Sequence, residues 1–283
     1  MPGSAATTGV TTATSAPAPI GLRVLRLVDR SRVAVFRDGR SGPRTLVTYV
    51  RYPRSGRGPF PLIVFGHGFA LLPGSYAKLL NAWTRAGFVV AAPVFPVENE
   101  HAPGGPDEND LSNQPGDMSF VISRLLASSA NPRSPLHGLI DPARVAVAGH
   151  SDGAETAFAV AYEQRFRDRR VRAAVILSGA ELPPETVVGG RASPALLAVQ
   201  GTADPINPPS ASYSLFRAVA RPKYLLRLLG AGHLPPYTTA VRQLEVVQRV
   251  TIAFLDRYLR AGSLDRLVAA GRAPGIARLT SDP

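Results

Sequence analysis

Short apolar runs alternate with longer segments in which apolar residues recur every three or four positions, from residue 62 to residue 261. The short runs predict buried strands and the longer segments predict amphipathic helices. The predicted strands are residues 62–65, 88–92, 145–148, 171–177, 195–199 and 224–229. The predicted helices are residues 75–86, 114–128, 154–165, 210–219 and 239–261. This alternation is typical of an α/β protein whose mostly parallel sheet is covered by helices on both faces.

Three more strand-like runs precede this alternation, at residues 21–28, 32–36 and 45–52, and turn residues separate them. Strands so close together without an intervening helix pair antiparallel. We therefore predict a sheet of about eight to nine strands with antiparallel N-terminal strands.

The chain divides into a tail, one domain and a short extension. Residues 1–19 are rich in Ala, Thr, Ser, Pro and Gly and carry no charge, which predicts a flexible lead-in. Residues 20–262 suffice for a single domain, and residues 263–283 are expected to add one short helix before fraying. The lead-in lacks the basic start and apolar core of a signal peptide. Its composition favours a secreted or exported protein whose signal has been removed, with a cytoplasmic protein as the alternative.

Composition restricts the partners. The 283 residues carry a formal charge of +12, and the arginines that dominate this charge are scattered along the chain. A nucleic-acid-binding protein concentrates its positive charge and interleaves aromatic residues, so we expect no nucleic acid partner. No apolar run approaches the roughly 18 residues of a membrane span. Cysteine is absent, which excludes disulfides, thiolate metal sites and a cysteine nucleophile. We expect a monomer.

The most informative motif is Gly149-His150-Ser151-Asp152-Gly153, placed between a predicted strand and a predicted helix. The two glycines allow a tight turn from which the serine projects. The N-terminus of the following helix favours negative charge beside it. The motif predicts that Ser151 is a nucleophile, although the bare pattern also occurs in ordinary strand-to-helix turns.

A serine hydroxyl needs a base, usually a histidine, to accept its proton. His67 and His150 lie in turns where their rings are expected to pack or hydrogen-bond. His101 lies in a polar loop, and His137 lies in a connection at the opposite edge of the sheet. His233 follows the strand at 224–229, at the carboxyl end where open α/β sheets place their active sites. His233 is therefore the predicted base, the alternative being a solvated loop histidine.

The predicted orienting carboxylate is Asp204, which follows the strand at 195–199 and also lies at a carboxyl end. Ser151, Asp204 and His233 then occur in the chain order that the α/β-hydrolase architecture uses. A turn aspartate beside a proline is also a common loop cap. Glu181 is the second candidate, and Asp152 is too close to Ser151 in the chain to support the histidine.

Two backbone N–H groups are expected to stabilise the negative charge that develops during acyl transfer. Gly66-His67-Gly68-Phe69 directly follows an early strand, so Phe69 and Asp152 are the predicted oxyanion donors.

The loop at residues 97–114 is rich in carboxylates, namely Glu98, Glu100, Asp107, Glu108 and Asp110. Carboxylates in such a loop are expected to be solvated, with a Ca²⁺ site as the alternative. We predict no metal and no cofactor. Asp117 is expected to place its charge at a helix N-terminus, and Trp83 is expected to pack in the core.

These motifs, together with Asp204-Pro-Ile-Asn-Pro208 and the spaced Gly232-His233, resemble the α/β-hydrolase superfamily between residues 49 and 261. Within it they resemble the dienelactone hydrolase-like, chlorophyllase-like and bacterial cutinase-like polyester hydrolases. The resemblance implies an α/β-hydrolase fold, the site residues named above and a substrate-binding surface at Phe69, His150 and Ala180.

Two departures concern the polyester hydrolases. These usually place a tryptophan where Ala180 stands here, and they commonly carry a C-terminal cysteine pair that this chain lacks.

The expected function is hydrolysis of a small-molecule or polymeric carboxylic ester through an acyl-enzyme. Two alternatives are a lyase or cofactor-free haloperoxidase on the same fold and a non-catalytic polyanion-binding protein.

Overall fold

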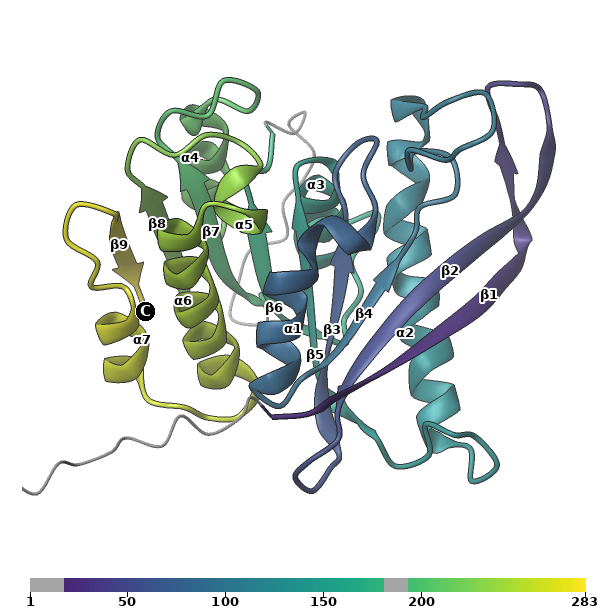
Figure 1. Cartoon of the computed structure of the whole chain (residues 1–283), viewed down its shortest axis with the longest axis horizontal. Helices are drawn as coiled ribbons and strands as arrows, with labels where there is room; N and C mark the ends of the chain where they lie inside the picture. Colours follow the sequence, from purple (N-terminus) through teal and green to yellow (C-terminus); the bar gives the residue numbers. More distant parts are fainter. Residues whose placement is uncertain (1–17, 181–192) are drawn as a thin grey trace, which may run out of the picture.

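The computed structural model describes residues 18–180 and 193–283, which form a nine-stranded sheet with helices on both faces (Figure 1). The predicted lead-in falls almost wholly outside the described residues, as does Glu181. The spatial order of the strands is β1 (Ile20–Val35), β2 (Ser41–Pro53), β4 (Val89–Pro93), β3 (Phe60–Gly66), β5 (Ile140–His150), β6 (Val171–Leu177), β7 (Ala195–Gly201), β8 (Lys223–Leu228) and β9 (Ala277–Asp282). Strands β4, β3, β5, β6, β7 and β8 run parallel, and β1, β2 and β9 add antiparallel pairs. The predicted strand number and N-terminal antiparallel pairing are confirmed.

The sheet separates two hydrophobic cores because alternate residues of each strand point to opposite faces. In β3, Ile63 and Phe65 enter one core and Leu62 and Val64 enter the other. The first core is covered by α1 (Ala77–Arg85), α6 (Val241–Leu259) and α7 (Leu264–Ala270). The second is covered by α2 (Gln114–Ala130), α3 (Asp152–Tyr162) and α4 (Pro209–Ala218). The predicted core residue Trp83 is fully buried on α1.

Short helical segments complete the upper edge of the sheet. They are η1 (Pro73–Tyr76), η2 (Glu108–Asn113) and α5 (Pro235–Thr238). Each follows the carboxyl end of a parallel strand, where open α/β sheets bind ligands.

The two strands predicted at 21–28 and 32–36 form the single strand β1. Its register against β2 shifts between Asp29 and Val33, which marks an irregularity in one continuous ladder. The Asp29 side chain accepts hydrogen bonds from Ser31 and Arg32, so these polar groups find their hydrogen-bond partners within the segment itself. The polar run therefore bends the strand without ending it.

The C-terminal segment differs from the prediction beyond its helix. The short helix is confirmed as α7, but the chain then forms β9, which pairs antiparallel with β8 over six residues and does not fray. The sequence from Ala277 onward is mostly polar and gives no apolar run. Backbone hydrogen bonds to the edge strand β8, and the packing of Leu279 against the core, account for the order.

A buried ion-pair cluster fixes η2 and α2 against the N-terminal strands. The Arg44 guanidinium is fully buried and pairs with Asp110 of η2 and with Asp117 of α2 at 2.6–2.8 Å. Arg32 also reaches Asp117, at 2.7 Å. Asp117 lies in the first turn of α2 as predicted. Asp110, which the sequence analysis expected to be solvated, is instead buried, because Arg44 neutralises its charge.

Candidate active site

Ser151 occupies a sharp turn between β5 and α3. Its backbone has φ +55° and ψ −125°, in the left-handed region that a non-glycine residue adopts only when its surroundings impose it. Side chains at Gly149 or Gly153 would collide with backbone, at Gly153 in the first case and at Gly66 in the second. Both glycines are therefore required by close approach, as the motif predicted, and the serine lies at the end of the turn.

Asp204 and His233 meet at the carboxyl edge of the sheet. Asp204 Oδ2 accepts a hydrogen bond from His233 Nδ1 at 2.9 Å, and Asp204 Oδ1 accepts the backbone N–H groups of Ile206 and Asn207 at 3.0 Å. Burial would raise the pKa of Asp204, but the hydrogen bonds from His233, Ile206 and Asn207 outweigh it and lower that pKa. The carboxylate therefore stays ionised, and Nδ1 of His233 carries a hydrogen that it donates, which leaves Nε2 as the basic nitrogen.

Ser151 and His233 line one cavity of about 410 Å³. The Ser151 hydroxyl donates to Asp152 Oδ1 at 3.3 Å, and the described structure contains no hydrogen bond between Ser151 and the His233 ring. A hydroxyl that donates to its neighbour's carboxylate must turn away from that carboxylate before it can donate to His233. Ser151 and His233 thus line the same cavity and Asp204 is hydrogen-bonded to His233, while the serine hydroxyl is turned toward Asp152.

Two backbone N–H groups are available next to Ser151. Asp152 is the first residue of α3, so its N–H has no acceptor within the helix. The Gly68–Phe69 turn lies against the nucleophile, since a Cβ on Gly68 would be 3.1 Å from Ser151 Cβ. Phe69 itself lines the cavity and is 40% exposed. The structure therefore places both predicted donors beside Ser151.

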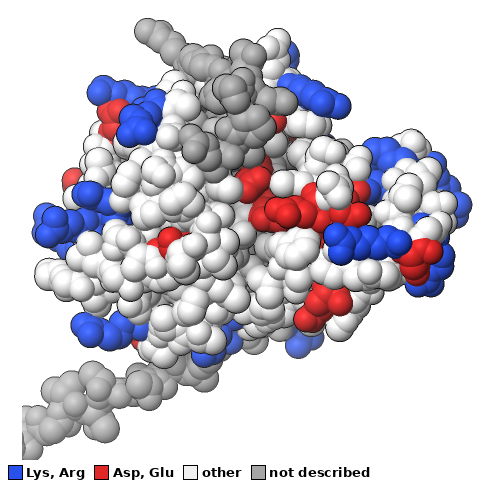
Figure 2. Space-filling model, turned by 90° about the horizontal axis from the view of Figure 1, so that it is seen from above, with Lys and Arg blue, Asp and Glu red and all other residues white. Residues whose placement is uncertain are grey.

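The cavity is lined by both apolar and acidic side chains. The apolar ones are Phe69, Leu71, Ile206 and Leu234. The carboxyl groups in the cavity belong to Glu108, Asp152 and Glu155. Figure 2 shows acidic residues gathered on this face of the molecule. Ala180 also lines the cavity.

Glu155 ionises at an unusually high pH. Burial, followed by the negative charge of Asp152, raises the pKa of Glu155 to about 8. Near pH 7 most of this side chain is therefore neutral, and it gains a negative charge in the cavity wall as the pH rises.

Glu98 lies behind the cavity and is fully buried, which corrects the expectation that the loop carboxylates are all solvated. Its Oε2 accepts from Gln114 Nε2, and Gln114 Oε1 in turn accepts from Thr156. Glu98 Oε1 and Asp152 Oδ2 are both buried without a hydrogen-bond donor among the described residues. Burial and Asp152 raise the pKa of Glu98 to about 10 and keep it neutral.

His67 and His150 pack and hydrogen-bond within the turns, as predicted. His67 Nε2 accepts from the N–H of Phe95 at 3.0 Å, and His67 Nδ1 lies 2.9 Å from the carbonyl oxygen of Gly68. His150 bonds to Tyr76 and to the backbone of His233. Both ring nitrogens of His150 are occupied and the residue is 1% exposed, so it offers a substrate only a ring edge.

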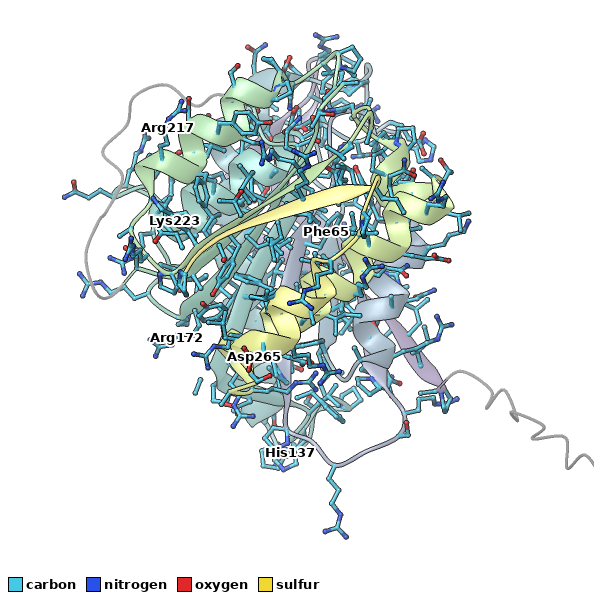
Figure 3. The ribbon with its side chains drawn as sticks, turned by 90° about the vertical axis from the view of Figure 1, so that its left-hand side faces the viewer. Phe65, His137, Arg172, Arg217, Lys223 and Asp265 are labelled. Carbon is cyan, nitrogen blue, oxygen red and sulfur yellow. The ribbon has the colours of Figure 1, made fainter. Side chains whose placement is uncertain are left out.

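The other two histidines lie away from the cavity. His101 is exposed beside Glu100. Phe65 lies near the carboxyl end of β3. Figure 3 shows His137 at the lower end of the molecule, far below Phe65. This agrees with the prediction that His137 lies at the opposite edge of the sheet.

Sequence reasoning missed Tyr76, Glu98 and Gln114 as parts of the site. Tyr76 lies in η1 and belongs to no motif. Gln114 begins α2 in the segment Asn113-Gln-Pro-Gly-Asp117, which resembles the family but predicted no role for Gln114. Glu98 was recognised only as one of several loop carboxylates. The signal for it was positional: Glu98 comes five residues after Pro93, the end of parallel strand β4, and so near the carboxyl edge where the site forms.

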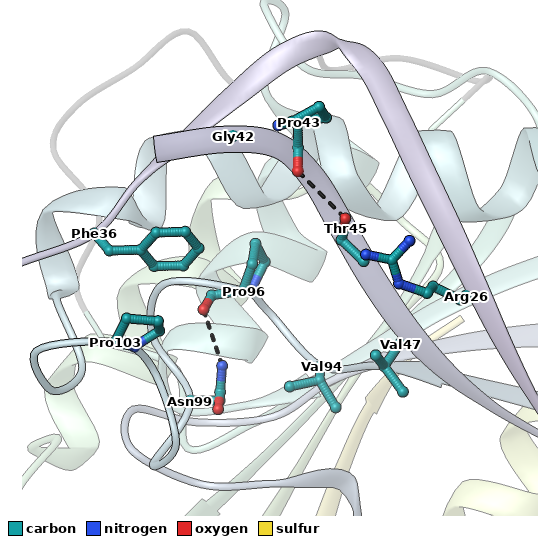
Figure 4. Close-up of a pocket in the computed structure, with 10 residues that line it drawn as sticks. All are labelled: Arg26, Phe36, Gly42, Pro43, Thr45, Val47, Val94, Pro96, Asn99 and Pro103. Carbon is teal, nitrogen blue, oxygen red and sulfur yellow. Dashed lines mark hydrogen bonds between the residues drawn. The ribbon is translucent and has the colours of Figure 1, made fainter. Parts of the chain in front are cut away.

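A second groove of about 480 Å³ lies between the β1–β2 hairpin and the loop after β4 (Figure 4). Its ten lining residues include Phe36, Val47 and Pro96, and Arg26 is the one ionisable residue among them. It contains none of the predicted site residues. Larger volume alone therefore does not identify the reactive cavity.

Within residues 18–180 and 193–283, no group of three or more histidine or carboxylate side chains is arranged to hold a metal ion. In the same part of the chain, no helix combines the length and the apolar character that crossing a membrane demands.

The strand order, the turn at Ser151 and the position of Asp204 and His233 define an α/β-hydrolase fold. A family model described as Chlorophyllase matches residues 27–177, which is more than half of the 283 residues. The chain belongs to the chlorophyllase family of the α/β-hydrolase superfamily. The matched region contains Ser151, Asp152 and Phe69, and it ends before Asp204 and His233.

The chain is also similar to a protein named "Chlorophyllase-1, chloroplastic" from Citrus sinensis, with 30% identity over 112 residues. The similarity covers 40% of this chain and 32% of the citrus protein.

Proposed function

We propose that this protein is a serine esterase that hydrolyses carboxylic esters through an acyl-enzyme, with Ser151 as nucleophile, His233 as base and Asp204 as orienting acid. The observation that carries the proposal is the Asp204–His233 hydrogen bond at 2.9 Å, in the wall of the cavity that contains Ser151. Membership of the chlorophyllase family supports it.

In the proposed reaction the Ser151 hydroxyl rotates from Asp152 to His233 Nε2. Its oxygen attacks the ester carbonyl carbon while His233 takes the proton. The carbonyl oxygen becomes an oxyanion and accepts hydrogen bonds from the N–H groups of Phe69 and Asp152, each of which is worth several kcal/mol in such sites. Collapse of this intermediate breaks the bond to the alcohol, which leaves with the proton from His233.

Deacylation follows the same route with water. His233 removes a proton from water, the hydroxide attacks the acyl carbon, and Ser151 leaves with that proton. Asp204 holds the ring with Nδ1 protonated and stabilises the imidazolium that forms in each half-reaction.

The cavity fits the proposal for small or extended esters. A volume of about 410 Å³ with apolar side chains at Phe69, Leu71 and Ile206 accommodates a short acyl chain. The name of the citrus relative makes a chlorophyll-type ester a candidate. Polyesters are the third candidate, although Ala180 supplies no ring to stack on an aromatic polymer unit.

The test is turnover of p-nitrophenyl butyrate, then of chlorophyll a and a polyester film, by the wild type and by Ser151→Ala. We expect hydrolysis of the butyrate by the wild type and its loss in the variant. Hydrolysis that survives the substitution would remove Ser151 from the mechanism. A wild type that halogenates or eliminates without cleaving any ester would favour the non-hydrolytic alternatives.

A further inference from the structure

The Gly68 peptide beside Ser151 is fixed by side chains at both ends. The Gly68 N–H donates to Tyr76 Oη at 3.2 Å, and the Gly68 carbonyl oxygen accepts from His67 Nδ1 at 2.9 Å and from the N–H of Leu71 at 3.2 Å. The Gly68 carbonyl and the Phe69 N–H belong to one planar trans peptide, in which they point in opposite directions. Whatever holds Gly68 therefore sets the direction of the Phe69 N–H.

Tyr76 continues this chain of contacts to the base. Tyr76 Oη lies 2.8 Å from His150 Nδ1, and His150 Nε2 lies 3.1 Å from the backbone carbonyl oxygen of His233. The His150 ring also packs on the His233 ring with centroids 4.6 Å apart. Three hydrogen bonds thus run from the Gly68 turn, through Tyr76 and His150, to His233.

The direction of each hydrogen bond follows from its acceptor. A carbonyl oxygen only accepts, so His150 Nε2 carries the hydrogen. Burial, followed by the charge of His233, lowers the pKa of His150 to about 3, so the ring is neutral and Nδ1 accepts. Tyr76 must then donate to Nδ1 and accept from Gly68, and burial raises the pKa of Tyr76, which keeps its hydroxyl protonated. Every polar atom is satisfied in this arrangement alone.

We infer that Tyr76 and His150 are positioning residues that hold the oxyanion turn at Gly68–Phe69 and the base His233 in a fixed relation to Ser151. This inference rests on the proposed function and extends it. Neither side chain transfers a proton to the substrate. Both act on the transition state through the groups that they orient, so their loss lowers kcat more than it changes KM.

The test is a double-mutant cycle with Tyr76→Phe, His150→Phe and the double variant, assayed with p-nitrophenyl butyrate. Tyr162→Phe is the matched control, since Tyr162 is equally buried and its hydroxyl donates to the carbonyl of Pro194 at 3.2 Å, away from the cavity. We expect each site variant to lower kcat about 10- to 100-fold, with KM within about threefold of the wild-type value. The double variant should be no slower than the slower single variant, because both substitutions break one chain.

Two results would overturn the inference while leaving esterase activity in the wild type and in Tyr162→Phe. One is a Tyr76→Phe enzyme whose kcat equals that of Tyr162→Phe. The other is a double variant whose fold-loss in kcat is the product of the two single losses.

If neither site variant folds, ¹⁵N NMR of the imidazoles in the wild type at pH 7 tests the inference instead. An Nε2–H tautomer at His150 supports the chain of hydrogen bonds, and an Nδ1–H tautomer or an imidazolium refutes it. An inactive wild type would instead refute the proposed function.

Discussion

Replacing Glu98 with Gln should make the protein more stable at alkaline pH. Glu98 is fully buried, and burial together with the neighbouring charge of Asp152 raises its pKa and keeps it protonated. The amide has nearly the same shape and accepts from Gln114 as the acid does. The substitution therefore preserves the contacts and removes a group that must stay protonated in the folded state.

The size of the effect follows from proton linkage. The pKa of Glu98 is raised by burial from 4.5 to about 10 in the folded protein. Between these values the folded state holds a proton that the unfolded state has lost, so the stability contributed by Glu98 falls as pH rises. The slope is about 1.4 kcal/mol per pH unit for one proton. Between pH 6 and pH 9 the stability of Glu98→Gln relative to wild type should rise by up to about 4 kcal/mol.

The assay is urea unfolding of wild type and Glu98→Gln at pH 6, 7, 8 and 9. Glu155, with its own raised pKa, contributes equally to both proteins and cancels in the difference. Glu100→Gln is the matched control, because its side chain is 50% exposed in the same loop. We expect a difference that grows with pH for Glu98 and stays flat for Glu100. A flat difference for Glu98 would show that it is not the buried neutral acid described here.

Three further predictions concern other parts of the molecule. Asp204→Asn should lower kcat toward p-nitrophenyl butyrate by up to about 10⁴-fold, because the amide stabilises the wrong His233 tautomer; a loss under tenfold would contradict its role. Glu155→Gln should keep more activity than wild type between pH 8 and pH 9.5, since the wild-type residue, with a pKa of about 8, acquires a charge beside the oxyanion as pH rises; superimposable pH–rate profiles would contradict this. Arg44→Met should lower the free energy of unfolding, measured with urea at pH 7, by about 3–5 kcal/mol, because it leaves Asp110 and Asp117 buried without their partner. A decrease below about 1 kcal/mol would contradict this explanation.

The sheet and the region around Ser151 were predictable because their signals are local or ordered along the chain. The apolar runs predicted each parallel strand, and the Gly149–Gly153 motif predicted the turn from close backbone approach alone. Asp204 and His233 were predictable because each follows a parallel strand, and all parallel strands end at one edge. This topology alone is enough to expect the two side chains to lie close to each other.

The remaining contacts depend on tertiary pairing that no local pattern encodes. Arg44 pairs with Asp110 and Asp117 across more than 60 residues of sequence. No local pattern shows this pairing, so the sequence alone predicted that the loop carboxylates are solvated. Glu98 is kept neutral by burial and by the charge of Asp152, whose position depends on the turn after β5. Strand β9 is polar and is ordered by the free edge of β8.

The most direct test of the central claim is the location of a covalent adduct. The protein would be treated with an alkyl p-nitrophenyl phosphonate, digested and mapped by mass spectrometry, while the loss of esterase activity is followed in parallel. We predict one equivalent of label on Ser151 in proportion to the activity lost, and slow labelling in a His233→Ala variant. Full inactivation with the label on another residue, or labelling of Ser151 with activity retained, would contradict the account.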